Sequence, residues 1–108
     1  MAAGFGDMQS LLKQAQDMQR RMQETQRALA ARTLEGTAGG GVVKAVVNGN
    51  QELQSVQIDK AAVDPEDVAT LEDLVTVAVR QALTAAKQLR DEETAKITGG
   101  MNLPGMGF

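Results

Sequence analysis

The sequence predicts a single α+β domain with the order α-β-β-β-α: a long helix, a three-stranded antiparallel sheet and a second long helix follow one another along the chain. The helices are predicted because apolar residues recur at alternating intervals of three and four over residues 8–29 and again over residues 68–89. Between these segments the period changes, and β-branched residues gather around an Asn-Gly pair. At 108 residues the chain has room for one such domain.

The first helix is expected to run from residue 7 to about residue 32, after a flexible end at residues 1–6. Asp7 is the expected N-cap, and no Gly or Pro interrupts the run that follows. Because such a helix is about 39 Å long, part of it should project from so small a core or meet a partner. Its apolar positions form a heptad pattern, widened by Leu12, at Met8, Leu11, Ala15, Met18, Met22, Thr25 and Leu29.

Three strands are expected at residues 33–38, 42–47 and 53–58, joined as an antiparallel meander. The middle segment is rich in valine, which suits a half-buried pleated surface. In the last strand Val56 and Ile58 share one face, because successive side chains of a strand point to opposite sides.

Two glycine-containing segments are expected to connect these strands. The three glycines at 39–41 precede a strand rather than a helix and lack a following Lys-Ser/Thr pair. This context favours a flexible hairpin connection over a phosphate-binding loop. Asn48-Gly49 is a strong signal for a two-residue type I′ turn, although the polar residues 50–52 leave a longer loop open.

The second helix is expected to have Asp64 as its N-cap and Pro65 in its first position, and to end at Gly99-Gly100. Residues 101–108 are expected to be a second flexible end. The apolar face of this helix is wider than three short strands can cover, so the chain is expected to be an obligate or near-obligate homodimer. The dimer interface is expected at Leu71, Leu74, Val75, Ala78, Val79 and Ala82.

The composition excludes most kinds of catalytic and metal chemistry. The chain has no Cys and no His, which excludes disulfides, thiolate zinc sites and Ser-His or Cys-His nucleophile pairs. Asp64, Glu66 and Asp67 carry the oxygen ligands that a hard cation prefers, but an acidic helix start explains them better. No stretch approaches the roughly 20 apolar residues that cross a membrane. The sequence predicts a soluble, cytoplasmic protein that is not an enzyme and needs no metal or cofactor.

The formal charge of -3 is distributed unevenly along the chain. Residues 7–32 hold five basic and three acidic residues, whereas residues 64–108 hold four basic and eight acidic residues. Lys13, Arg20 and Arg27 share one heptad position, opposite the apolar positions of the first helix. This stripe has two interpretations. It is either a ridge that contacts DNA phosphates, duplicated by dimerisation, or a solvated helix face balanced by acidic residues three and four positions away.

Short segments in all parts of the chain, in order and with matching spacing, resemble those of a known family. They are Leu12-Lys13-Gln14-Ala15-Gln16 with Met18-Gln19 and Met22-Gln23; Gly41-Val42-Val43-Lys44, Val47-Asn48-Gly49 and Val56-Gln57-Ile58-Asp59; Leu71-Glu72-Asp73-Leu74-Val75; and Gly100-Met101-Asn102-Leu103-Pro104. These segments resemble the first helix, the central sheet, the last helix and the tail of the YbaB/EbfC nucleoid-associated proteins.

The resemblance implies an intertwined α+β homodimer whose long helices project like tweezers. It also implies a bacterial protein without enzymatic activity that binds duplex DNA in the nucleoid. The DNA contacts would come from the projecting helices. By resemblance, the DNA-binding residues are Lys13, Arg20, Arg21 and Arg27, with Arg80 and Lys87 as further candidates.

The leading hypothesis is a homodimer of the cytoplasm and nucleoid that coats or compacts duplex DNA through phosphate contacts with little sequence specificity. Gene regulation and DNA protection are further roles under this hypothesis. The alternative is a dimeric protein-interaction module whose acidic surface engages replication or recombination proteins, with weak DNA binding or none. Salt separates the two hypotheses, because binding through phosphates releases counterions and weakens steeply as salt is added.

Overall fold

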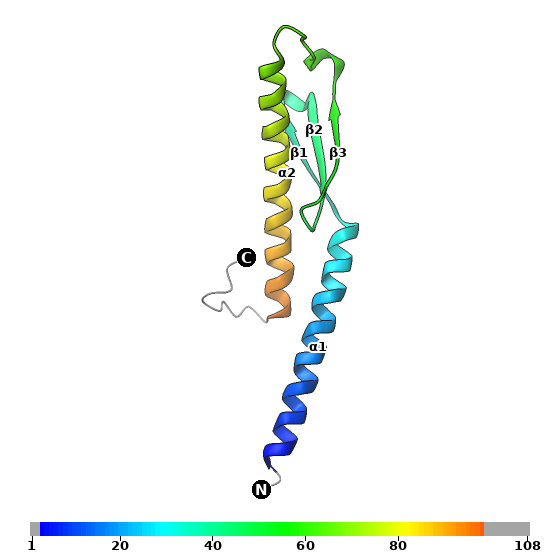
Figure 1. The fold of residues 1–108 in the computed structure, drawn as a ribbon, viewed down its shortest axis with the longest axis vertical. Coiled ribbons are helices and arrows are strands. Elements are labelled where there is room, and N and C mark those ends of the chain that lie inside the picture. Colours follow the sequence, from blue (N-terminus) through cyan, green and yellow to red (C-terminus); the bar gives the residue numbers. More distant parts are fainter. Residues whose placement is uncertain (1–2, 99–108) are drawn as a thin grey trace.

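The computed structural model describes residues 3–98, which form an elongated molecule with a helix projecting at one end (Figure 1). Its extents are 79 × 26 × 16 Å. The predicted class and element order are confirmed, whereas Gly99-Gly100 and the end at 101–108 lie outside the described residues. The elements are α1 (Ala3–Ala31), β1 (Thr33–Ala38), η1 (Gly39–Gly41), β2 (Val43–Asn48), β3 (Leu53–Ile58), η2 (Lys60–Ala62) and α2 (Val68–Ile97).

The three strands form an antiparallel meander in the order β1-β2-β3. One face of this sheet packs against α2, which lies over β1 and β2 (Figure 1). Buried residues recur at every second position in β2 and at every fourth position in α2, as expected for a strand and a helix that face each other. The fully buried core residues are Val43, Ala45 and Val47 of β2 and Ala78, Ala82 and Ala86 of α2.

A glycine lets the backbone of α2 lie directly on β1. A Cβ atom on Gly36 would stand 2.6 Å from the backbone nitrogen of Ala82, a distance that real Cβ atoms do not adopt. Beside it, the backbone N–H of Thr37 donates a hydrogen bond to Oε1 of Gln81 at 2.6 Å. The small residues on both elements thus bring helix and sheet into close contact.

The strand β3 is left uncovered, because α2 lies over the other two strands. Ile58 pairs with Val43 and Val56 pairs with Ala45, so their side chains share the core face of the sheet. All residues of β3 are nevertheless exposed. We call Leu53, Val56 and Ile58 the β3 strip; it extends the apolar core to an open edge of the sheet.

The helix α1 begins at Ala3, four residues before the predicted start, so the prediction that Asp7 is its N-cap is wrong. An existing helix gains a hydrogen bond with each added residue and needs no new nucleus, which offsets the poor helix propensity of Gly4 and Gly6. The C-terminal turns of α1 reach the sheet and α2, and its N-terminal half projects past the end of α2 (Figure 1).

The helix α2 begins at Val68 and is capped by Asp67, so the predicted cap at Asp64 is wrong. The Asp67 carboxylate accepts hydrogen bonds from the Thr70 N–H at 3.3 Å and from the Thr70 hydroxyl at 2.7 Å. Asp64 instead accepts a bond from the Glu66 N–H at 3.0 Å. This local turn competes with helix formation, and it delays the start of α2 by three residues.

The predicted type I′ turn at Asn48-Gly49 is wrong, and the longer loop is correct. Residues 49–52 connect β2 to β3, and the positive φ of 63° falls at Gln51. The buried side chain of Asn48 organises the loop. Its Oδ1 accepts bonds from the N–H groups of Asn50 and Glu52, each at 3.0 Å, and its Nδ2 donates to Oε1 of Glu52 at 2.7 Å.

Candidate nucleic-acid interface

Lys13, Arg20 and Arg27 form an exposed line along one side of α1, which we call the basic ridge. Neighbouring members are seven residues apart, a separation of about 10.5 Å along the helix axis. The other side of α1 faces α2, because Met22 and Thr25 line a groove with residues of α2. At about 100° per residue, Arg27 lies about 140° to 200° around the helix from those two residues. The ridge therefore points into solvent.

The acidic residues of α1 engage only part of the ridge. Arg20 lies 3.4 Å from the carboxylate of Asp17 and 3.9 Å from that of Glu24. Within residues 3–98, Lys13 and Arg27 form no ion pair. Exposed pairs of this kind contribute about 0–1 kcal/mol, so another anionic group can replace them. The ridge carries cations that are available to an anionic partner.

The end of α1 is fastened to the loop after β2. The N–H of Gly49 donates hydrogen bonds to the carbonyl oxygens of Leu29 and Arg32, at 2.9 and 3.0 Å. The Leu29 carbonyl also accepts a bond from the Arg32 N–H at 3.1 Å, and the Gly49 bonds give carbonyl groups at the end of α1 a partner outside the helix. A Cβ atom on Gly49 would stand 2.7 Å from the Leu29 oxygen. Glycine is therefore required here for close approach to α1.

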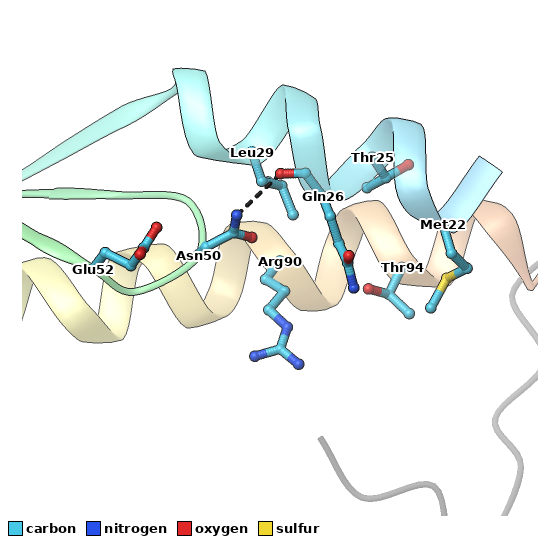
Figure 2. A pocket seen from close by; sticks show the side chains of 8 residues that line it. All are labelled: Met22, Thr25, Gln26, Leu29, Asn50, Glu52, Arg90 and Thr94. Carbon is cyan, nitrogen blue, oxygen red and sulfur yellow. Dashed lines mark hydrogen bonds between the residues drawn. The ribbon is translucent and has the colours of Figure 1, made fainter. Parts of the chain in front are cut away.

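A groove of about 450 Å³ lies between the last turns of α1, the 49–52 loop and α2 (Figure 2). Asn50 reaches across it, and its Nδ2 donates a hydrogen bond to the Gln26 carbonyl oxygen at 3.0 Å. Close by, Arg32 and Glu93 form an ion pair at 3.7 Å between the end of α1 and α2. These contacts set the direction in which α1 leaves the core, and with it the direction of the basic ridge.

The sequence model of the YbaB/EbfC DNA-binding family matches residues 4–101. The chain belongs to this family. A nucleoid-associated protein of Thermoanaerobacter sp. (strain X514) is 52% identical over 103 residues, which make up 95% of this chain and 92% of that protein. Another, from Moorella thermoacetica, is 50% identical over 102 residues, or 94% of this chain and 98% of that protein. The resemblance described from the sequence is confirmed, and the family is a DNA-binding one rather than one of enzymes.

The fold of this YbaB/EbfC chain also occurs in a solved structure. The crystal structure of an uncharacterized protein from Helicobacter pylori superposes with a TM-score of 0.74 and 22% sequence identity. The match covers 88% of this chain and 97% of that one. At this identity the likeness supports the fold and nothing finer.

The other predicted DNA-binding residues of this YbaB/EbfC protein lie away from the ridge. Arg21 lines a cleft between α1 and Ile97 at the end of α2. Arg80 and Lys87 are exposed on α2, one heptad apart, about 200° and 140° around the helix from buried Ala82. The structure thus brings three of the six predicted residues together and places the other three elsewhere.

The residues predicted for the dimer interface fall into two groups in this YbaB/EbfC fold. Ala78 and Ala82 have no exposed surface, because they pack against the sheet of their own chain. The remaining four, Leu71, Leu74, Val75 and Val79, are partly exposed at the margin of the core. The β3 strip was not among the residues predicted for the interface. Strand periodicity showed that its residues share a face, but not how far α2 covers that face.

Two of the three acidic residues considered for a cation, Asp64 and Asp67, accept hydrogen bonds from backbone N–H groups. In the described part of the chain, no three metal-ligating side chains gather at one place. Nor does any helix among residues 3–98 have the length and apolar character needed to cross a membrane.

Proposed function

We propose that this protein is a homodimer that binds duplex DNA through its phosphates, with little sequence specificity, and organises the bacterial nucleoid. It acts without catalysis, metal or cofactor. The observation that carries the proposal is the basic ridge, three exposed cations in line on the projecting helix of a chain that belongs to a DNA-binding family.

The geometry of the ridge suits phosphate contact. Lys13 and Arg27 stand about 21 Å apart, and duplex DNA carries about twelve phosphates over that axial length. Arginine can bind a phosphate through two parallel N–H groups, and lysine binds it as a point charge. Such contacts hold the protein on the duplex but carry no direct sequence information, which is why we propose little specificity.

A second copy of the chain is the proposed cover for the β3 strip. Gln81 bonds to β1, and Val79 lies two residues away, about 200° around the helix, so Val79 is on the flank of α2 toward β3. That flank and the β3 strip together form an apolar surface beside the core. Two copies related by a twofold axis would cover each other's surface and duplicate the basic ridge.

A mobility-shift titration with duplex DNA at two salt concentrations tests the proposal. The variant Lys13→Ala/Arg27→Ala should bind more weakly on every DNA sequence tried. The slope of log affinity against log salt is negative. If a dimer loses four phosphate contacts, the magnitude of this slope decreases by about 3.6. The matched control is Lys44→Ala/Lys60→Ala, which removes the same charge from β2 and η2, and it should change the slope much less.

Equal losses in the two variants would assign the effect to net charge and overturn the role of the ridge. A folded wild-type protein that does not bind duplex DNA even at low salt would overturn the proposed function. The protein-interaction hypothesis, in which the acidic residues of α2 engage another protein, would then take its place.

A further inference from the structure

The apolar face of α1 that packs toward α2 continues beyond the place where α2 stops. Met22 and Thr25 of this face line the groove with Arg90 and Thr94 (Figure 2). One turn earlier in α1, Met18 lines a second cleft with Ile97, the last residue of α2. The contact between the two helices ends at this cleft.

Past Met18 the same face of α1 lies open. Met8 and Leu11 are each 63% exposed, and Leu12 is 59% exposed. We call these residues, with Ala15, the arm stripe. Contiguous apolar residues on one face of a projecting helix are costly to leave in water, and such a patch generally marks a contact.

The chain itself continues from the point where the arm stripe begins. Residues 99–108 follow the end of α2, contain no charged side chain, and include four large apolar residues, Met101, Leu103, Met106 and Phe108. The distance to be covered, from Met18 to Met8, is about 15 Å along α1. Ten residues span up to about 33 Å when extended, and because α2 runs toward the projecting half of α1, the chain needs no reversal to reach the arm stripe (Figure 1).

We propose that residues 99–108 continue along the projecting half of α1 and cover the arm stripe of their own chain. The cover matches the stripe in chemistry, since neither contains a charged side chain and Met and Leu supply most of the large apolar residues of both. It lies on the side of α1 opposite the basic ridge, so it leaves the ridge open to DNA. The interaction stiffens the arm without occupying its charged face.

Paired cysteines in the full chain test the proposal, because the protein has no Cys of its own. The test variant carries Leu11→Cys with Leu103→Cys. The control carries Ser10→Cys with Leu103→Cys, and Ser10 is the exposed neighbour of Leu11, about 100° around the helix and away from the stripe. Disulfide formation under mild oxidation is followed by mass and by non-reducing electrophoresis, after circular dichroism has shown both variants to be folded.

The expected result is a disulfide within one chain that forms at least tenfold faster in the Leu11 variant than in the Ser10 control. Equal rates would show that residues 99–108 stay flexible, as their composition suggested, and would overturn the proposal. Disulfides between chains would overturn it too, because a second copy would then cover the stripe.

A second measurement needs no cysteine. In the full chain, Leu103→Ser/Phe108→Ser should increase the rate of Met8 oxidation by peroxide several-fold, because the side chain of Met8 loses its cover. Met22, which lies in the groove between α1 and α2, provides the internal control and should react at an unchanged rate. An unchanged rate at Met8 would contradict the proposal.

Discussion

The N–H of Gly49 and the carbonyl oxygen of Leu29 are joined by a hydrogen bond of 2.9 Å, which fastens the last turn of α1 to the loop between β2 and β3. The contact requires glycine, because any side chain would overlap the same carbonyl. The direction of the basic ridge thus depends on a residue that lies outside α1.

The variant Gly49→Ala should loosen the base of α1. Overlap of this kind costs about 1–3 kcal/mol, and it should speed amide hydrogen exchange in the last turns of α1 more than in β1. The control Gly40→Ala places a Cβ atom in open space at a positive φ of 72°. It should leave exchange in α1 unchanged. Equal effects of the two variants on α1 would contradict the prediction.

The variant Gly36→Ala should destabilise the whole domain, because the new Cβ atom would push the backbone of α2 away from β1. We expect a loss of about 3 kcal/mol, seen as a lower midpoint in chemical denaturation with an unchanged slope. Gly40→Ala is again the control and should cost about 1–2 kcal/mol from backbone strain alone. Wild-type stability in Gly36→Ala would show that α2 does not pack so closely.

Neutralising the two acidic residues that pair with Arg20 of the basic ridge should strengthen DNA binding. In Asp17→Asn/Glu24→Gln, Arg20 is released from both of its ion pairs, so we expect a several-fold gain in affinity and a steeper salt slope. The control Glu72→Gln/Asp73→Asn makes the same change in net charge on α2. If both variants gain DNA affinity equally, the net charge of the protein causes the gain, and the release of Arg20 in the basic ridge does not.

One substitution in the β3 strip should separate the proposed subunits. Val56→Lys places a charge on the face of β3 that a second copy would cover, and sedimentation should then show a monomer at micromolar concentration. Gln57→Lys adds the same residue on the opposite face of the strand and should leave the assembly intact. A wild-type protein that is itself a stable monomer would contradict the proposed dimer.

The element order was predictable because it depends on local periodicity. The heptad positions of α1 and the valine-rich run of β2 are set by neighbouring residues, and a helix and a strand form at these places, although α1 starts four residues earlier than predicted. The basic ridge was visible for the same reason, since an unbroken helix fixes the relative direction of Lys13, Arg20 and Arg27. A family resemblance spread over the whole chain supplied the connection to DNA.

What could not be predicted depends on contacts between distant residues. Gly49 was interpreted as a turn residue, but its N–H donates a hydrogen bond to the carbonyl oxygen of Leu29, which lies twenty residues earlier. Asp64 and Asp67 are both good caps, and a local turn at Asp64 decided between them. Ala78 and Ala82 share an apolar pattern with their neighbours, and the position of Gly36 in β1 determines that they are the residues buried within the chain.

The attachment of α1 through its last turns has a mechanical consequence. From Leu29 to Met8 the helix extends about 32 Å. A tilt of about 10° at its base therefore moves the far end by about 5.5 Å and changes the groove between α1 and α2, while the sheet stays unchanged. A straight rod pivoting at a small joint amplifies small rearrangements around Gly49 into a large sweep of its tip. If the basic ridge binds DNA as proposed, this lever lets the arm follow duplexes of different curvature without any repacking of the core.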